Sequence, residues 1–418
     1  MTLGWPLGLA VASGVPVLIL LSLGPVAELA GPPSVVVWAL AALIGMAMAV
    51  PFAELVCLFP DQTGGIAVMS AHALRSHSRL LAVVVQWSYW LGWSLGMGIN
   101  SILIGDYLRR LLLPGSSRWA AWLIAVTILT VSVVVNHRGI RPGAWFQLSL
   151  LACTVAVAGF LLVFPLLTGE AEFARLTPFR PPDGWASLHT PIAVAGAFFI
   201  AGWSAYGAEI ALAYRAEYRG DARDVLRSLM TVAGITVAVY SVVPALALVA
   251  VGLDRVEGGP VLLFESLSGP GGPVRSLLVP VALVGALFLT LNTIATGSSR
   301  TLWQMARNGE AWSVLGRLNR HGVPGNALIF DLVANATVLA VSLLINQRSG
   351  DVPISLLASA NVGYFLSIIL ALVAVWMMRR TAPERARPFR SPAGYVGLGL
   401  VIAGFNAVLL AGAGAAWG

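Results

Sequence analysis

Uncharged stretches alternate with short charged loops along the whole chain of 418 residues. An α-helix needs about 20 mostly apolar residues to cross the hydrocarbon core of a bilayer, so each stretch of that length predicts one membrane-spanning helix. Eleven such stretches are found, at 6–29, 33–58, 80–108, 117–135, 144–168, 187–214, 226–252, 274–299, 325–346, 352–378 and 393–416. The pattern therefore predicts an all-α integral membrane protein with about 11 transmembrane helices.

The predicted spans follow one another without a large interruption. The longest loops, 169–186 and 300–324, are too short for an independent folded core. The first stretch has no basic segment before it, so we expect a working helix there rather than a cleaved signal peptide. We therefore expect one membrane domain over 1–418.

Two of the predicted spans are irregular, and they lie five helices apart. The first contains Gly14, Pro16, Gly24 and Pro25, and the sixth contains Gly202 and Gly207 around Trp203. Broken helices at matching positions of two halves indicate an inverted repeat. The alternative is ordinary kinking, or close helix packing at small residues.

Composition agrees with a membrane protein, and the charge indicates its topology. The chain is 58% hydrophobic and 10% charged, and its mean hydropathy is +0.85. All 25 basic residues are arginines, and most of them fall in the loops after the even-numbered stretches. By the positive-inside rule these loops are cytoplasmic, which places the N-terminus in the cytoplasm and the C-terminus outside. Because the net charge of +7 is spread over short loops, a nucleic-acid-binding surface is not indicated.

Cofactor chemistry has no support in the sequence. The two cysteines, Cys57 and Cys153, lie inside apolar stretches, which argues against a disulfide framework or a zinc site. The five histidines are scattered, and no phosphate-binding P-loop is present. We therefore expect no metal, no cofactor and no use of ATP.

Four segments in the loops carry a family resemblance. They are Ala53-Glu54-Leu55 with Phe59-Pro60 and Gly64-Gly65; Glu217 to Asp224; Ser299 to Gly309 with Asn319 to Pro324 and Asn326 to Leu328; and Arg387-Pro388-Phe389-Arg390. Their order and spacing resemble those of amino acid permeases in the amino acid–polyamine–organocation superfamily. The alternative for any one segment is a basic loop held by lipid phosphates.

The resemblance implies a LeuT-like bundle of two inverted repeats of five helices. The repeats would be 1–168 and 187–378, and 393–416 would be an extra C-terminal helix. Unwound segments of spans 1 and 6 would hold an amino acid or amine near the middle of the membrane. Ends of half-helices suit such a ligand, because free N–H groups attract a carboxylate and free carbonyls attract an ammonium group.

In span 6 the chain closely resembles the family pattern of an aromatic residue, a glycine and a later glutamate. The residues implied to contact substrate are Ala201, Gly202, Trp203, Ser204 and Gly207, and Glu209 is the implied site of proton coupling or gating. Trp203 could close over a substrate side chain. The alternative is a tryptophan packed against lipid or a neighbouring helix.

Span 1 departs from the family pattern. Leu18, Ile19 and Leu20 stand where these transporters usually have Gly-Ser/Thr-Gly, and they are followed by Leu21 and by Ser22, where an aromatic residue is common. Glycines would let a substrate approach the backbone. The larger side chains must fill that space or move the substrate.

Spans 3 and 8 supply further candidate substrate contacts. Met97 and Asn100 lie at helical spacing from a Tyr89-Trp90-Leu91 run that resembles the family. Asn292, Thr293 and Ile294 fall at the level where the family contacts its substrate. The alternative for the polar members is hydrogen bonding between helices.

Two acidic residues, Glu209 and Asp331, lie well inside apolar stretches. A charge there costs at least about 2.5–3.5 kcal/mol, so a functional role is the first hypothesis for each. For Asp331 the alternative is a pairing with an arginine near the cytoplasmic surface.

These observations predict a secondary active transporter of amino acids or related amines in a bacterial inner membrane, working by alternating access. Neutral apolar amino acids, export, and coupling to protons or to exchange are the leading hypotheses; the Glu209–Glu217 spacing resembles that of methionine and branched-chain amino acid exporters. Sodium coupling through the hydroxyls of Thr293, Thr296 and Ser298, together with span 1 carbonyls, is the alternative. Another hypothesis is a non-transporting subunit or sensor whose substrate-binding segment in span 1 has degenerated. A membrane enzyme is the weakest hypothesis, because no polar catalytic cluster is found. The oligomeric state is left open.

Overall fold

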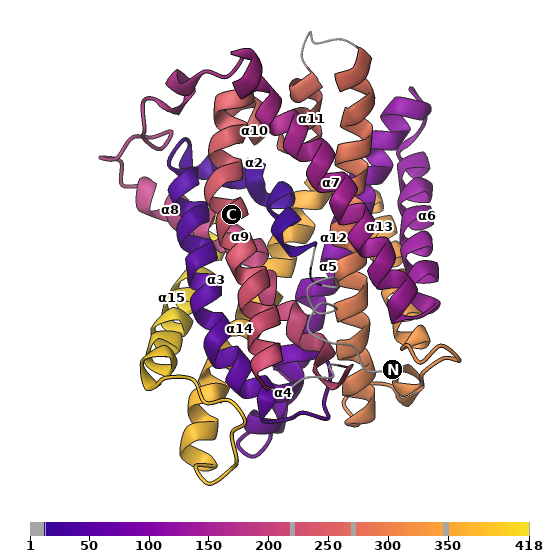
Figure 1. Cartoon of the computed structure of the whole chain (residues 1–418), viewed down its shortest axis with the longest axis vertical. Helices are drawn as coiled ribbons and strands as arrows, with labels where there is room; N and C mark the ends of the chain where they lie inside the picture. Colours follow the sequence, from indigo (N-terminus) through magenta and orange to yellow (C-terminus); the bar gives the residue numbers. More distant parts are fainter. Residues whose placement is uncertain (1–11, 13, 218–221, 269–272, 346–350, 418) are drawn as a thin grey trace.

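The computed structural model describes residues 12, 14–217, 222–268, 273–345 and 351–417 as a bundle of helices (Figure 1). The elements are η1 (Val15–Val17), α2 (Ile19–Ala30), α3 (Ser34–Cys57), α4 (Gly65–Leu74), α5 (Arg79–Leu112), α6 (Arg118–His137), α7 (Ile140–Thr168), η2 (Phe173–Leu176), α8 (Thr190–Ala205), η3 (Gly207–Glu217), α9 (Ala222–Val251), α10 (Leu253–Glu257), α11 (Gly259–Ser268), α12 (Pro273–Arg307), η4 (Ser313–Gly316), α13 (Gly325–Ile345), α14 (Asp351–Thr381) and α15 (Ala393–Trp417), where η marks a 3₁₀-helix.

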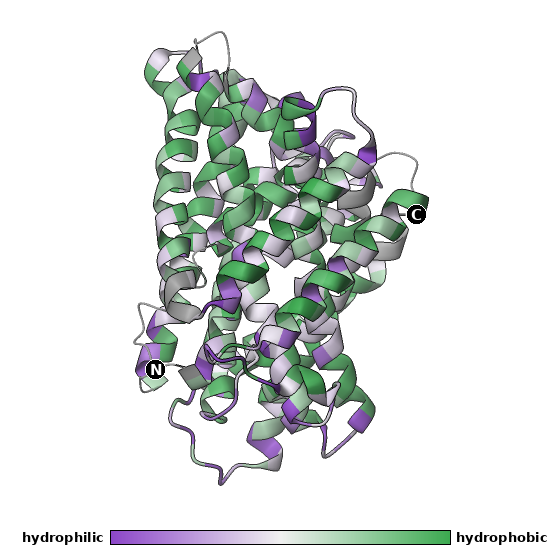
Figure 2. Ribbon diagram, turned by 90° about the vertical axis from the view of Figure 1, so that its right-hand side faces the viewer, coloured by the Kyte–Doolittle hydropathy of each residue, from purple (hydrophilic) through white to green (hydrophobic). Residues whose placement is uncertain are grey.

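Ten helices of the described residues are long and apolar enough to cross a membrane. They match the predicted spans from the second to the eleventh, and this confirms the all-α membrane fold. The first predicted span is described from Ala12 onward as a shorter apolar helix, Val15–Ala30, while 6–11 and 13 lie outside the described residues. Figure 2 shows that the helices are mostly hydrophobic and that hydrophilic residues gather in the loops at the two ends.

Helix α5 lies at the centre of the bundle and packs against α14, α12 and α6. Glycines at the crossing allow the backbones of α5 and α14 to approach closely. A methyl group added to Gly92 of α5 would lie 2.9 Å from Cβ of Tyr364, and one on Gly363 of α14 would lie 2.6 Å from the carbonyl oxygen of Ser88. Small residues give helices this kind of tight contact in membranes, where lipid supplies no hydrophobic drive for association.

Spans 1 and 6 both change helix type near positions predicted to be irregular, and we call these two points the breaks. In span 6 the α-helix α8 ends at Ala205, and after Tyr206 the chain continues as the 3₁₀-helix η3. In span 1 the short 3₁₀-helix η1 precedes α2, which begins at Ile19. A change from one helix type to the other redirects backbone carbonyls and side chains. The helical backbone continues through both points, and Gly24 and Pro25, which were also expected to make span 1 irregular, lie within α2.

Candidate functional site

The breaks of spans 1 and 6 lie side by side and are bonded to each other. The hydroxyls of Ser22 in α2 and Ser204 in α8 are 3.1 Å apart. Tyr240 of α9 donates from its hydroxyl to the carbonyl oxygens of Val15 and Ser204, both at 3.2 Å. One tyrosine thus contacts a backbone carbonyl at each break.

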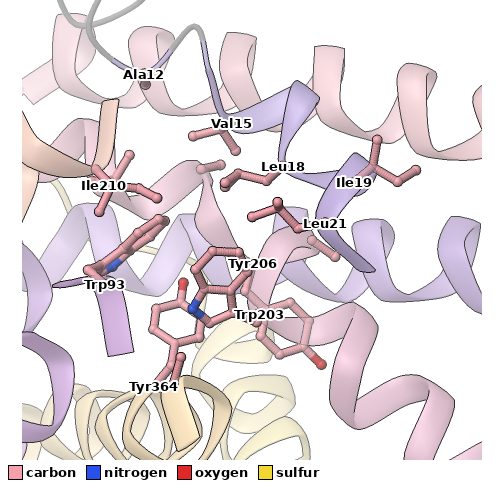
Figure 3. Close-up of a cluster of buried hydrophobic side chains, with 14 of the residues drawn as sticks. Ala12, Val15, Leu18, Ile19, Leu21, Trp93, Trp203, Tyr206, Ile210 and Tyr364 are labelled. Carbon is pink, nitrogen blue, oxygen red and sulfur yellow. The ribbon is translucent and has the colours of Figure 1, made fainter. Parts of the chain in front are cut away.

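Apolar and aromatic side chains fill the space between the breaks (Figure 3). A methyl group added to Gly207 would lie 3.1 Å from the Trp93 ring and 3.3 Å from Cδ1 of Leu18. The rings of Trp93 and Trp203 have their centroids 5.8 Å apart. Leu18 therefore occupies the position facing the span 6 break, where a glycine would leave room for a ligand.

Neighbours of Leu18 point in other directions. Ile19 and Leu20 line a cavity of about 330 Å³ between α7 and α9, and Ile19 points away from Trp203 in Figure 3. Leu21 lines a second cavity, on the opposite side of α2. Of the four consecutive apolar residues predicted to contact substrate, Leu18 is the one among the nearest neighbours of Gly207.

Trp203 is fixed in place by helix α5. Its indole N–H donates to the carbonyl of Gly92 at 2.8 Å, and its ring meets Cδ1 of Ile294 above Gly96, where an added methyl group would lie 2.8 Å from both side chains. The predicted residues Trp203 and Ile294 therefore lie together against α5. Gly202 packs closely against the Phe365 ring of α14, since an added methyl group would be 2.5 Å from that ring.

Ala201 and Met97 are fully buried in the same core. Asn100 donates to the carbonyl of Gly96 at 2.7 Å and accepts from the hydroxyl of Thr290. Asn100 therefore links α5 to α12 and matches the interhelical alternative considered for it.

Glu209 lies in η3, two residues after this helix begins at Gly207, and it is hydrogen-bonded to three aromatic side chains. Its carboxylate accepts from the hydroxyl of Tyr89 at 2.7 Å, from the indole N–H of Trp93 at 3.1 Å and from the hydroxyl of Tyr364 at 3.0 Å. The carboxylate is buried, and the partners bonded to it are uncharged. Such a site accommodates a carboxyl group that changes its protonation state.

Asn292 and Thr293 of α12 belong to a separate network of neutral side chains. Asn292 donates to Oε1 of Gln147 at 2.5 Å and accepts from Asn136 at 2.6 Å. Thr293 accepts from the amide N–H of Gly14 at 3.2 Å, and it is also bonded to Gln147. These two predicted contacts join α12 to α6, α7 and span 1 rather than to the span 6 break.

Asp331 of α13 is fully buried and has no arginine among its bonded partners in the described residues. Its Oδ1 accepts from the indole N–H of Trp90 at 2.8 Å and from the hydroxyls of Ser94 and Ser298, both at 3.0 Å. The pairing with an arginine that we considered from the sequence is therefore wrong.

At one end of the bundle the loop motifs meet and are bonded to span 6. The amide N–H of Gly64 donates to the carbonyl of Ala213 in η3 at 3.0 Å, and the hydroxyl of Thr301 donates to the carbonyl of Gly64 at 3.2 Å. The guanidinium of Arg300 lies over the ring of Tyr214 at 4.4 Å. The first and third motifs are thereby joined to span 6, and we call this the motif end.

Glu54 and Arg387, which come from the first and fourth motifs, also meet there. The carboxylate of Glu54 accepts from Nε of Arg387 at 3.2 Å and from Nε of Arg379 at 2.9 Å. Residues 218–221 of the second motif lie outside the described residues.

Toward the opposite end a cavity of about 430 Å³ opens among α2, α5, α10 and α11. Acidic side chains in its lining are Glu28, Asp106, Glu257 and Glu265, and its basic ones are Arg110 and Arg118. Burial, followed by repulsion from Asp254 and Glu28, raises the pKa of Glu257 above 4.5. No group of three potential metal ligands is found among the described residues.

Three residues at the breaks were not predicted from the sequence: Trp93, Tyr240 and Tyr364. Trp93 could have been found, since it follows Tyr89 by four residues and therefore shares its helix face. Tyr240 and Tyr364 are single polar aromatics within apolar spans, a signal too weak to distinguish them from tyrosines at other positions.

Comparison with known proteins gives consistent matches. A family model described as amino acid permease matches residues 3–416. An uncharacterised transporter of Mycobacterium tuberculosis is 28% identical over 333 residues, which cover 78% of this chain and 70% of that protein. A probable GABA permease of Pseudomonas aeruginosa is 24% identical over 370 residues, covering 86% and 74%. A mutant manganese transporter of Eremococcus coleocola has a similar structure, with a TM-score of 0.59, 16% identity, and coverage of 97% of this chain and 85% of that one; this likeness supports the LeuT-like fold.

Proposed function

We propose, given that the chain belongs to the amino acid permease family, that it is a secondary active transporter of amino acids or related amines and works by alternating access. The observation that carries the proposal is the meeting of two broken spans at one buried point, where Tyr240 bonds a carbonyl of each break. Irregular backbone at membrane depth is tolerated where protein or a cavity satisfies it, and transporters place their substrates there.

Neutral apolar amino acids are the proposed substrates. Leu18, Trp93 and Trp203 form an apolar wall beside Gly207, and such a wall favours an apolar side chain over a charged one. An ammonium group would bind the carbonyls that now accept from Tyr240. Relatives are named for different substrates, such as GABA or glutamate and serine, so the wall rather than any relative guides this choice.

One of the two cavities suggests a direction of access. The cavity beside α10 and α11 reaches Leu21, while the motif end is closed by backbone and side-chain bonds. If the arginine-rich loops are cytoplasmic, this state faces outward, in a bacterial inner membrane with the N-terminus inside. We propose export as the net direction, on the resemblance of the Glu209–Glu217 spacing to that of exporters. The repeats are proposed to span 1–168 and 187–378, with 393–416 as the extra helix.

We propose proton coupling or exchange, with Glu209 as the group that changes its protonation state. Its neutral, buried shell supports this role. Sodium coupling has less support, because the three hydroxyls considered for it face different partners. Thr293 accepts from the Gly14 amide, Thr296 donates to the Thr293 carbonyl at 2.8 Å, and Ser298 donates to Asp331.

Proteoliposomes containing the purified protein test the proposal. Uptake and counterflow of radiolabelled amino acids, with and without a pH gradient, should identify at least one neutral substrate and a response to the gradient. Counterflow without any effect of the gradient would favour pure exchange. Complete absence of both uptake and counterflow across the twenty amino acids and common amines would favour the alternative, a membrane subunit or sensor on the same scaffold.

A further inference from the structure

The buried carboxyl of Asp331 has no role in the function proposed above. It lies seven residues into α13, about 9 Å along the helix from its start at the motif end. The groups bonded to it come from α5 and α12, and all are uncharged: Trp90, Ser94 and Ser298 donate to Oδ1. Arg300, the nearest arginine along α12, lies over Tyr214 instead.

The two oxygens of this carboxyl differ sharply. Oδ1 accepts three hydrogen bonds, whereas buried Oδ2 has no hydrogen-bond partner among the described residues. A proton can therefore join or leave Oδ2 without breaking any of the three bonds to Oδ1. An ionised carboxylate left permanently in such a place would be costly, since no positive charge is bonded to it.

Helix α5 connects this carboxyl with Glu209. Tyr89 and Trp93 donate from one face of α5 to Glu209, while the residues directly after them, Trp90 and Ser94, donate from the adjoining face to Asp331. A segment of α5 fewer than two turns long, residues 89–94, is thus bonded to both buried acids. A shift of this segment toward one acid changes the hydrogen bonds of the other.

Aromatic rings pack beside Asp331 on the side of the motif end. Trp90 is half-buried, and its ring lies 5.5 Å from Trp87 and 5.6 Å from Phe330, while Phe330 lies 5.5 Å from the exposed ring of Trp312. These four rings separate Asp331 from the surface. A change of the Trp90 rotamer would break its bond to Oδ1 and open this side of the carboxyl.

We propose that Asp331 is a second proton-binding site, which exchanges its proton at Oδ2 from the motif end and is linked to Glu209 through α5. The proton is taken from, and returned to, water on that side, and no other bond is formed or broken. The linkage rests on the proposed function of Glu209, but proton binding at Asp331 does not.

Infrared difference spectroscopy of the full chain in lipid nanodiscs tests the site without a transport assay. The carbonyl stretch of a protonated carboxyl appears or disappears as the pH is changed, and Asp331→Asn should remove one buried carboxyl band. Asn keeps an oxygen in place of Oδ1, so the fold is expected to persist. Asp61→Asn is the matched control, because Asp61 is exposed and its variant should lose only a solvent-exposed band.

Two further variants make the result decisive. Ser298→Ala removes one donor from Oδ1 and should move the midpoint of the Asp331 band by about one pH unit, the equivalent of one hydrogen bond to a charged group. Glu209→Gln should also move that midpoint. Identical carboxyl bands in the wild type and Asp331→Asn would overturn the proton site, whatever the transport result. A midpoint unmoved in Glu209→Gln would overturn the linkage through α5.

Discussion

Replacing Glu54 with alanine should weaken the motif end severely. The Glu54 side chain is 1% exposed and accepts from both Nε and Nη2 of Arg379, from Nε of Arg387, and from the amide and hydroxyl of Ser391. Removal of one partner from a buried ion pair costs about 3–5 kcal/mol, because the remaining charge stays buried without compensation.

Where the loss of stability falls within this range depends on the hydrogen bonds that Arg379 and Arg387 retain. Their side chains are 15% and 7% exposed, so water reaches them poorly. Arg387 still donates to the carbonyls of Met378 and Ala382, and Arg379 still donates to the carbonyl of Ser391. These remaining bonds favour the lower end, about 3 kcal/mol of unfolding free energy.

The assay is an unfolding titration of purified Glu54→Ala in mixed micelles. Glu384→Ala serves as the control, since Glu384 is an exposed carboxylate in the same loop as Arg385 and Arg387. The control should change stability by no more than a surface charge does. A loss below about 1 kcal/mol in Glu54→Ala, the value of an exposed ion pair, would refute the reasoning.

Three further predictions concern two residues at the breaks, Glu209 and Leu18, and one residue of the cavity beside α10 and α11, Glu257. Glu209→Gln, which resembles the protonated acid, should bind substrate but lose the pH dependence of transport; a variant that loses thermal stability yet keeps its pH profile would show that Glu209 is only an anchor. Leu18→Gly should change the ratio of uptake of large to small amino acids by about tenfold or more, because it adds space for one or two methylene groups. The control Leu20→Gly should leave this ratio unchanged. Equal uptake profiles for the two variants would contradict the placement of Leu18. Because the pKa of Glu257 is raised above 4.5 in the folded protein, the stability that its protonation contributes is complete below pH 4.5 and is lost as the pH rises through the raised pKa. Thermal unfolding of Glu257→Gln should lack this decline, and an unchanged slope against pH would contradict it.

The membrane fold could be predicted from the sequence because the bilayer imposes a length and a composition on each crossing helix. The changes of helix type in spans 1 and 6 could be predicted in part, since Pro16 lies in η1 and Gly207 begins η3, whereas Gly24 and Pro25 lie within α2. Side-chain directions near the breaks could not. The 3₁₀-helix η1 gives way to the α-helix α2 at Leu18, so the directions of Leu18, Ile19 and Leu20 do not follow from one helical period applied along the whole span.

Contacts between distant segments limited the prediction of the site in a different way. Asn292 and Thr293 stand at the expected level of span 8, but their direction depends on Gln147 and Asn136, which lie in other helices. Tyr364 reaches Glu209 from a helix 155 positions away in the chain. Spacing within one span carries no information about such partners.

The shared hydrogen bond of Tyr240 has a consequence for the residence time of a ligand. Its single O–H proton is shared between two carbonyls, each 3.2 Å from the oxygen, and the Val15 carbonyl also accepts from the amide of Leu18 at 3.1 Å. An arriving ammonium group brings three donors and would replace that proton at both carbonyls. The net gain is only the difference between the new bonds and the shared one, because Tyr240 must give up its own. A ligand held in this way dissociates readily, and a carrier that must release its cargo in every cycle benefits from modest affinity.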